Sequence, residues 1–176
     1  MILKLKRTPG LYLVGFMGCG KSVVGAQLAE RLGWAFGDLD TDIESGEGTS
    51  ITEIFDTRGE DEFRRLETEA LQRRVGMVQA GTALVLALGG GAFVQPRNYQ
   101  LVENNGISIW LDCPLPMIRR RLADSTDRPL ARDPKKFEIL YHARRQSYTL
   151  ADYHIQITSD DPAAVVEAVL ELPLFQ

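Results

Sequence analysis

Short apolar runs alternate with longer segments of helical periodicity along this chain. Five runs of strand type occupy residues 11–14, 34–37, 83–88, 107–111 and 154–157. Seven segments have the composition and spacing of helices, at residues 21–32, 51–57, 62–79, 97–102, 116–123, 135–150 and 162–170. Because strands and helices alternate, the pattern predicts an α/β fold, with a parallel sheet covered by helices on both faces.

Two of the predicted helices have clear start signals. Ser50 and Glu53 have the capping-box spacing at the start of 51–57, and Asp161 precedes a proline at the first position of 162–170. In open parallel sheets, ligands bind beyond the carboxyl ends of the strands. The loops that follow the five strands are therefore the expected location of a functional site.

The loop after the first strand, from Gly15 to Ser22, reads GFMGCGKS and fits the phosphate-binding P-loop pattern G-x-x-x-x-G-K-[ST]. Its glycines let main-chain N–H groups approach an anion closely, and the next helix points its positive end at the same place. Lys21 can reach the outer phosphates of a nucleotide, and the Ser22 hydroxyl can bind Mg²⁺. The alternative, a glycine-rich turn without a ligand, leaves the ordered series of strand, loop, Lys-Ser pair and helix unexplained.

Two carboxylates, Asp38 and Asp40, follow the second strand. If this segment is extended, the two side chains point the same way, because side-chain direction repeats every two residues. One can then help to hold Mg²⁺ through water, while the other accepts a hydrogen bond from a substrate hydroxyl or acts as its base. The alternative is that Asp40 or Asp42 caps a helical turn through Ile43.

Arg64 lies beside the apolar face of the helix predicted at 62–79. Glu67 is three residues further along, so it can neighbour Arg64 and orient its guanidinium. An arginine at the edge of a core suits bidentate binding of a carboxylate or phosphate. A solvated surface arginine is the alternative, and the residues alone leave both open.

Three consecutive glycines, Gly89, Gly90 and Gly91, follow the third strand. Because they have no side chains, they leave backbone N–H groups open to a ligand. The alternative is a tight turn, which requires only one glycine. The triple glycine therefore favours a binding surface at this strand end.

A polar stretch bracketed by prolines, residues 124–134, follows the helix predicted at 116–123. It carries two arginines near the expected phosphate site, so it is a candidate lid. Proline fixes the backbone after Arg128, and an arginine there can supply positive charge to a transferring phosphoryl group on closure. Further along, Arg144 or Arg145, ahead of Tyr148, can face a substrate, and a solvated helix surface is the alternative.

Composition narrows the class of protein. The chain has 176 residues, 44% of them hydrophobic, which fits one globular domain over residues 1–176. A formal net charge of −4 argues against a surface that coats nucleic acid, so any anion site must be local.

The two cysteines and the apolar segments bear on location. Cys19 and Cys113 form neither a disulfide framework nor a metal-binding spacing, which favours a reducing compartment. No stretch approaches the roughly 20 apolar residues of a membrane span. No exposed apolar heptad or extra interface element is visible. We therefore expect a cytoplasmic monomer with neither a membrane nor a nucleic-acid partner.

The motifs GFMGCGKS, DLD, EFRRLE, GGGA and RPL, followed by an arginine ahead of a tyrosine, extend over nearly the whole chain. In this order they resemble the shikimate kinase family, which belongs to the P-loop kinases. The resemblance implies a three-layer P-loop kinase fold, with a five-stranded parallel sheet of order 2-3-1-4-5 and a mobile lid. It also implies transfer of the γ-phosphoryl group of ATP to the 3-hydroxyl of shikimate, with Mg²⁺, in chorismate and aromatic amino acid biosynthesis.

The same resemblance implies which residues bind ATP and Mg²⁺. The ATP-binding positions are Gly18, Cys19, Gly20, Lys21, Ser22, Val23 and Arg128. Ser22 binds Mg²⁺, and Asp38 supports the hydrated ion. Residues 159–162 border the adenine. Val23 stands where the family often has a threonine.

It also implies a shikimate site, with substrate-binding helices at about 38–67. The substrate-binding positions are Asp40, Arg64, Gly89, Gly90, Gly91 and Arg144. Arg144 is preferred to Arg145 because it lies four residues before Tyr148. The catalytic roles fall to Lys21, Asp40 and Arg128.

Two other classes of protein stay open. One is a related small-molecule kinase, such as a gluconate kinase or a nucleoside monophosphate kinase. The triple glycine with Arg64 and the Asp38/Asp40 pair favours a small acid with vicinal hydroxyls over a nucleotide acceptor. The other class is a non-catalytic ATP-dependent switch, which needs only the nucleotide half of the site.

Overall fold

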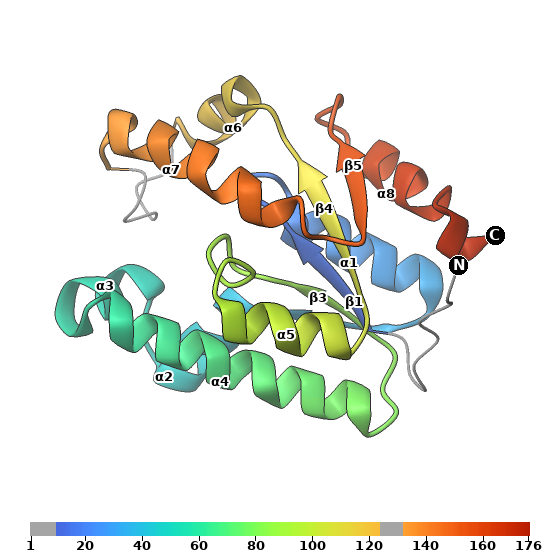
Figure 1. The fold of residues 1–176 in the computed structure, drawn as a ribbon, viewed down its shortest axis with the longest axis horizontal. Coiled ribbons are helices and arrows are strands. Elements are labelled where there is room, and N and C mark those ends of the chain that lie inside the picture. Colours follow the sequence, from blue (N-terminus) through green and yellow to red (C-terminus); the bar gives the residue numbers. More distant parts are fainter. Residues whose placement is uncertain (1–9, 124–131) are drawn as a thin grey trace.

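Five parallel strands form the central sheet of the structure, a computed structural model that describes residues 10–123 and 132–176 (Figure 1). The strands are β1 (Gly10–Val14), β2 (Ala35–Asp38), β3 (Leu84–Ala87), β4 (Ile107–Asp112) and β5 (Tyr153–Gln156). Their order is β2-β3-β1-β4-β5, and every neighbouring pair is parallel. The predicted parallel α/β sheet and its strand order 2-3-1-4-5 are confirmed.

Helices cover both faces of this sheet. In the described part of the chain they are α1 (Lys21–Leu32), α2 (Leu39–Glu47), α3 (Ile51–Arg58), α4 (Glu60–Gln79), α5 (Pro96–Asn104), α6 (Leu115–Leu122), α7 (Pro134–Tyr148) and α8 (Pro162–Leu170), followed by the 3₁₀ turn η2 (Pro173–Phe175). Helices α1 and α8 pack together on one face, whereas α5 and α7 lie over the other (Figure 1). Helix α4 packs against α5 and against α2, so α2, α3 and α4 form a group beside the sheet.

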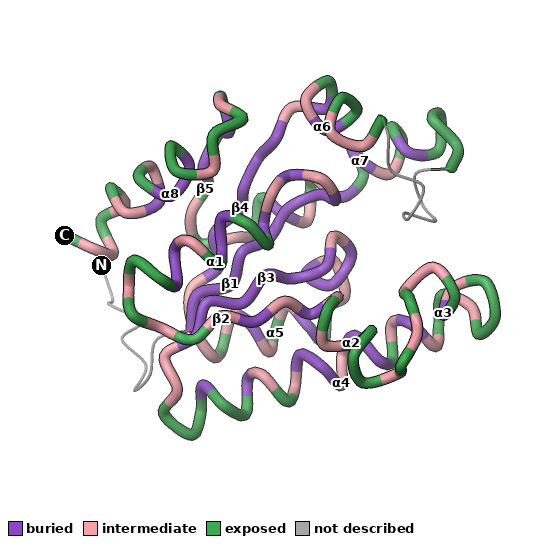
Figure 2. Tube along the Cα trace, turned by 180° about the vertical axis from the view of Figure 1, so that it is seen from behind, coloured by how far each residue is buried: buried purple, intermediate pink, exposed green. Residues whose placement is uncertain are grey.

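The central strand β1 is buried along its whole length, and Figure 2 shows the same for β3 beside it. The run from Leu11 to Val14 is apolar without alternation because helices cover both faces of the sheet. The strands are parallel, so their carboxyl ends lie at one edge of this core. The P-loop follows β1 at that edge, and the triple glycine follows β3.

Several helix boundaries follow from local capping. The Ser50 hydroxyl accepts a hydrogen bond from the N–H of Glu53 at 3.1 Å, and the Asp161 carboxylate accepts one from Ala163 at 3.0 Å, so both predicted caps are confirmed. Helix α1 ends, as predicted, before Gly33, which adopts a left-handed φ of 67°. Among the described residues, no helix is long and apolar enough to cross a membrane.

The segment after β2 differs from its prediction. Asp38 ends the strand and caps α2, because its Oδ1 accepts hydrogen bonds from the N–H groups of Asp40 (3.0 Å) and Thr41 (3.3 Å). The expectation of an extended segment through Asp40 is therefore wrong, and the cap expected of Asp40 or Asp42 is Asp38. Helix α2 was not predicted from the sequence because aspartate, threonine, serine and glycine make up much of its nine residues and have low helix propensity.

Candidate functional site

Lys21, the first residue of α1, folds back against the loop that precedes it. Its ammonium donates hydrogen bonds to the backbone carbonyls of Gly15 at 2.8 Å and Phe16 at 2.9 Å, and the residue is buried. Gly20, just before the helix, has a left-handed φ of 92°, which glycine adopts without strain. The loop therefore turns sharply into α1 and brings the lysine charge to the positive end of the helix.

A cavity of about 380 Å³ opens beside this loop, and we call it the P-loop cavity. Its volume lies within the range of roughly 300–1,000 Å³ that is typical of small-molecule sites. It is lined by Gly18, Cys19, Gly20, Lys21, Ser22, Val23, Val24, Asp38, Asp40, Leu88, Gly90, Arg121, Leu122, Ile157, Ser159, Asp160, Pro162 and Val165. The structure thus brings the P-loop residues and most of the segment 159–162 around one space.

Ser22 and Asp38 meet at the edge of the P-loop cavity. The Ser22 hydroxyl donates a hydrogen bond to Oδ2 of Asp38, whose Oδ1 caps α2. One hydroxyl and one carboxylate are hard oxygen donors, and Mg²⁺ at nucleotide sites takes one or two such protein ligands together with phosphates and water. This donor set therefore fits Mg²⁺. Among the described residues, no group of three or more histidine, cysteine, aspartate or glutamate side chains could hold a metal ion.

A smaller cavity of about 60 Å³ lies where α3, α4 and α7 approach the triple glycine, and we call it the Arg64 cavity. Its lining consists of Met17, Asp40, Ile51, Phe55, Phe63, Arg64, Glu67, Gly89, Gly90, Gly91 and Arg144. All six residues predicted to bind substrate are in this lining, although they are spread from Asp40 to Arg144 along the chain. Asp40 and Gly90 line both cavities, so the two spaces adjoin at these residues.

Arg64 is held in place from two sides. Its Nη1 donates to Oε1 of Glu67 at 2.7 Å, which confirms the predicted contact, and its Nη2 lies 3.3 Å from Oε1 of Glu60. The guanidinium also lies close against Gly91, where a Cβ atom would come within 2.5 Å of Nη2. The side chain is only 15% exposed, so Arg64 is not a solvated surface arginine.

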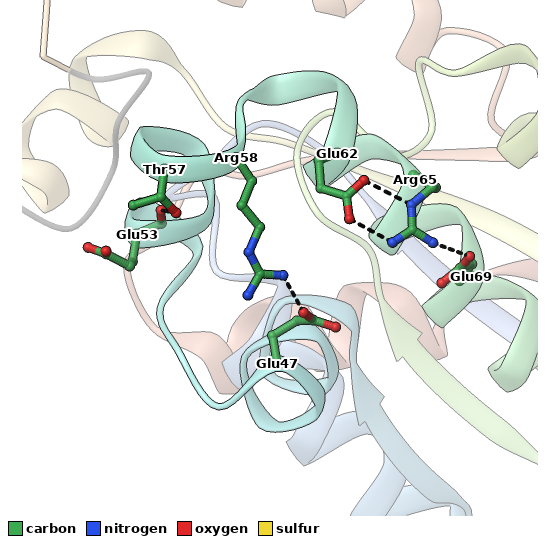
Figure 3. Close-up of polar contacts among 7 residues, drawn as sticks. All are labelled: Glu47, Glu53, Thr57, Arg58, Glu62, Arg65 and Glu69. Atoms are coloured by element: carbon green, nitrogen blue, oxygen red, sulfur yellow. Dashed lines mark hydrogen bonds and ion pairs between the residues drawn. The ribbon is translucent and has the colours of Figure 1, made fainter.

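Arg65, the next residue of α4, shows what a surface arginine looks like in this structure (Figure 3). Its guanidinium pairs with Glu62 at 2.6 Å and with Glu69 at 2.5 Å, and its side chain is 54% exposed. In the same view, Arg58 at the end of α3 pairs with Glu47 at the end of α2. Exposed pairs of this kind contribute little to stability.

Glu67 is a buried carboxylate in the wall of the Arg64 cavity. The residue is fully buried, and its Oε2 has no hydrogen-bond partner among the described residues. Burial raises the pKa of this carboxyl, and the neighbouring Asp40 charge also raises it, while Arg64 and Arg144 act in the opposite direction. Oε2 lies 2.8 Å from the place that a Cβ atom on Gly89 would take, so only glycine leaves room for it.

Arg144 and Arg145 face different surroundings. Arg144 is buried and lines the Arg64 cavity; burial lowers the pKa of its guanidinium. Arg145 forms hydrogen bonds with both oxygens of the buried Asp112 and one with the hydroxyl of Tyr141. Of the two arginines, therefore, Arg144 is the one that faces a cavity.

The triple glycine presents free backbone donors. Gly89 and Gly91 are buried, and Gly90 is half-buried. Within the described chain, the N–H groups of these three glycines donate hydrogen bonds to no carbonyl and no side chain. Buried donors are normally satisfied, so this set is suited to a bound ligand.

The sequence analysis did not identify Arg121 of α6, which lines the P-loop cavity. Its Nη1 donates to the Gly18 carbonyl at 3.2 Å, and its guanidinium pairs with Asp160 at 3.1 Å. Three consecutive arginines at the end of α6 were a visible signal of positive charge. Which of them faces the P-loop depends on the rotation of the helix against β4, and local sequence does not contain this information.

The predicted lid lies mostly outside the described residues. Arg128 belongs to the segment 124–131, which the structure does not describe, so its expected role stays a prediction. The end of the candidate lid is described. There Asp133 caps α7 through the N–H groups of Lys135 and Lys136, and Arg132 pairs with Asp56 of α3 at 3.1 Å.

Comparison with known proteins points to one family. A family model described as shikimate kinase matches residues 17–172. A shikimate kinase from Synechococcus sp. strain CC9605 is 43% identical over 173 residues, which cover 95% of this chain and 84% of that protein. The residues matched by the family model include every residue that lines the two cavities.

Solved structures give the same result. The structure described as shikimate kinase from Acinetobacter baumannii in complex with shikimate is similar with a TM-score of 0.88 at 36% identity, covering 95% of this chain and 93% of that one. A gluconokinase from Sinorhizobium meliloti 1021 has a TM-score of 0.58 at 17% identity and covers 93% of this chain and 90% of its own. This similarity shows a shared fold alone. The similarity to gluconokinase therefore carries no argument about the acceptor.

Proposed function

Because the chain belongs to the shikimate kinase family, we propose that its P-loop cavity holds ATP and its Arg64 cavity holds shikimate. The activity of this family is a phosphotransfer in the shikimate pathway. In the proposed reaction, the γ-phosphoryl group of ATP passes to the 3-hydroxyl of shikimate and gives shikimate 3-phosphate and ADP. One observation carries this assignment: Asp40 and Gly90 line both cavities, so a donor and an acceptor can meet at these residues.

The Arg64 cavity has the chemistry of a site for a small hydroxylated acid. The buried Arg144 and the largely covered Arg64 supply two guanidinium groups, which can bind one carboxylate with strong charge-assisted hydrogen bonds. Ile51 and Phe55 offer an apolar wall to a carbon ring. Asp40 accepts hydrogen bonds from ring hydroxyls at the side that adjoins the P-loop cavity, and the glycine N–H groups donate to the same ligand.

Positioning and fixed positive charge drive the transfer step. The transition state spreads negative charge over the moving phosphoryl group, so little covalent chemistry is required of the protein. Lys21 and the N-terminus of α1 supply charge from the P-loop side, and Arg128 is proposed to add charge from the lid. Asp40 orients the acceptor hydroxyl and takes its proton as the phosphoryl group arrives.

Ser22 and Asp38 are the residues proposed to hold Mg²⁺. A bound Mg²⁺ neutralises charge on the β- and γ-phosphates. Asp38 is already fixed by its cap of α2, and Ser22 lies in the first turn of α1. Their hydrogen bond keeps both oxygen donors at the P-loop cavity, on the side where it meets Asp40.

The same proposal extends to the working unit, which we take to be a monomer with one domain over residues 1–176, active in the cytoplasm. Both cysteines are free and buried, which suits a reducing compartment. Among the described residues, the exposed large apolar side chains are Val23 in α1, Met77 in α4, Ile139 in α7 and Leu150 in the turn after α7, so they are spread along the chain. Size-exclusion chromatography with light scattering tests the monomer, and a mass of twice 19.6 kDa would contradict it.

An ADP-release assay coupled to pyruvate kinase and lactate dehydrogenase tests the function. The purified chain is assayed with ATP and Mg²⁺ in four arms: shikimate, gluconate, AMP and no acceptor. We expect ADP release that depends on shikimate, and mass spectrometry should identify shikimate 3-phosphate as the product. Gluconate-dependent release would support the related kinase instead, and equal release in all four arms would indicate an acceptor-independent ATPase.

A further inference from the structure

Helix α7 contacts the triple glycine through two side chains. The Tyr148 hydroxyl donates a hydrogen bond to the backbone carbonyl of Gly90, and Tyr148 is only 1% exposed. One turn earlier, Nη1 of Arg144 lies 3.3 Å from the place that a Cβ atom on Gly90 would take. Arg144 lines the Arg64 cavity, whereas Tyr148 lines neither cavity, although its hydroxyl also interacts with the Arg144 guanidinium.

The peptide between Gly90 and Gly91 has unusual freedom to turn over. Rotation of this peptide changes ψ of Gly90 and φ of Gly91, and neither residue has a Cβ atom to restrict those angles. In a trans peptide the carbonyl and the N–H point in opposite directions. The direction of the Gly90 carbonyl therefore sets the direction of the Gly91 N–H.

We propose that Tyr148 is a positioning residue for the acceptor site: its hydroxyl holds the Gly90 carbonyl toward α7 and thereby keeps the Gly91 N–H available in the Arg64 cavity. This inference rests on the proposed role of that cavity in binding shikimate. The N–H of Gly91 donates no hydrogen bond within the described chain, so it is free to bind an acceptor oxygen.

Loss of the Tyr148 hydroxyl changes the preferred orientation of the peptide between Gly90 and Gly91. Without Tyr148 as donor, the carbonyl of the half-buried Gly90 loses its partner, which favours turning toward other donors or solvent. The turned-over peptide presents a carbonyl oxygen to the cavity where an N–H is required. Apparent affinity then falls in proportion to the fraction of molecules that keep the competent orientation.

Helix α7 offers a matched control. The hydroxyl of Tyr141, which is also buried, donates to the backbone carbonyl of Cys113 at 2.9 Å. Tyr141→Phe therefore removes the same kind of bond from the same helix, together with the acceptor of Arg145 Nη1 at 3.0 Å, but away from the glycine turn. Tyr148→Phe keeps the ring and removes only the oxygen.

The experiment compares the two variants with the wild-type chain, first by steady-state kinetics. We expect Tyr148→Phe to raise the KM for shikimate about tenfold, the scale of one hydrogen bond at about 1.4 kcal/mol. The KM for ATP should stay within about twofold, since Tyr148 does not line the P-loop cavity. Tyr141→Phe should leave the KM for shikimate near the wild-type value, even if it lowers the melting temperature as much as Tyr148→Phe does.

Amide NMR without substrates supplies a readout that does not depend on activity. In Tyr148→Phe, but not in Tyr141→Phe, the ¹H–¹⁵N resonance of Gly91 should shift or split, and the spectrum also shows whether each variant is folded. An unchanged Gly91 resonance, or an equal rise of the shikimate KM in both variants, would overturn the proposal. A wild-type chain without shikimate-dependent ADP release would instead contradict the proposed function, and the Gly91 resonance would still test the role of Tyr148.

Discussion

Arg144 and Arg145 are adjacent in α7 but belong to different parts of the structure. Arg144 lines the Arg64 cavity, whereas Arg145 pairs with the buried Asp112, and its guanidinium stacks 4.9 Å from the ring of Trp110. Neighbouring residues of a helix point about 100° apart. The rotation of α7 therefore directs one arginine to the Arg64 cavity and the other to the sheet.

This separation predicts opposite phenotypes for two neighbouring substitutions. Arg144→Ala should raise the KM for shikimate at least about thirtyfold, the lower end of roughly 2–5 kcal/mol for a lost buried charge pair. Arg145→Ala should leave that KM within about threefold and lower the free energy of unfolding by about 2 kcal/mol, because it leaves Asp112 buried without its main partner. Coupled kinetics and urea unfolding measure both; a larger KM effect for Arg145→Ala would contradict the assignment.

Arg64 and Arg65 provide a second matched pair. Arg64→Ala should weaken shikimate binding, measured by isothermal titration calorimetry, by roughly 2–5 kcal/mol with little effect on ATP binding. Arg65→Ala removes only exposed ion pairs, so its effects on binding and stability should stay below about 1 kcal/mol. Loss of ATP affinity in Arg64→Ala, with shikimate affinity kept, would reverse the assignment of the two cavities.

The raised pKa of the Glu67 carboxyl predicts that the free energy of unfolding depends on pH. Burial raises the pKa of its carboxyl in the folded chain above the usual 4.5, so the folded state holds a proton that the unfolded state has released. The resulting stabilisation is complete below pH 4.5 and is lost as the pH rises through the folded-state pKa. Glu67→Gln has no such proton, so the unfolding free energy of the wild type relative to this variant should fall as the pH rises from 4.5 through the folded-state pKa of Glu67.

Urea unfolding of both proteins at matched pH values measures this difference. The decrease is bounded by about 1.4 kcal/mol for each pH unit between the two pKa values. A wild-type free energy that rises relative to Glu67→Gln over this range would mean that Arg64 overcomes burial and lowers the pKa.

A substitution at Asp38 should change the Mg²⁺ dependence of the activity without removing the cap of α2. Asparagine caps helices as well as aspartate does, so Asp38→Asn should keep α2 and cost less than about 1 kcal/mol of stability. The Mg²⁺ concentration for half-maximal activity should rise about tenfold, a typical loss when one group of a metal site is changed. Asp161→Asn, at the cap of α8, is the control and should leave the Mg²⁺ titration unchanged.

The parallel sheet and the P-loop were predictable because each rests on local signals, whereas the strand order 2-3-1-4-5 was implied by the family resemblance. Apolar runs of strand length, the GFMGCGKS loop and the caps at Ser50 and Asp161 are short-range patterns that the tertiary structure reinforces. The P-loop residues came from a local motif, but the grouping of the acceptor-site residues came from a family pattern, since no local rule relates Asp40 to Arg144. The family resemblance therefore predicted the acceptor site and the strand order, and the hydrophobic periodicity predicted the strands and helices.

The features that the sequence did not predict share a physical cause, because each depends on long-range packing. Helix α2 has poor intrinsic propensity, and its first turn is specified by the Asp38 cap and by buried Leu39 and Ile43. Arg121 and Tyr148 acquire their positions from the rotation of α6 and α7 against β4. No spacing along the chain encodes such a rotation.

Gly89 has a consequence for how the acceptor range of this enzyme can change. A Cβ atom there would come within 2.8 Å of Glu67 Oε2 and 3.0 Å of Asp40 Oδ1, so even alanine displaces a carboxylate. Gly89 therefore cannot be exchanged stepwise for larger residues, so this part of the lining of the Arg64 cavity is fixed. The same lining contains the apolar side chains of Ile51 and Phe55 of α3, which can be exchanged for larger or smaller ones without loss of a charged group, so a search for variants with new acceptors should begin at those two positions.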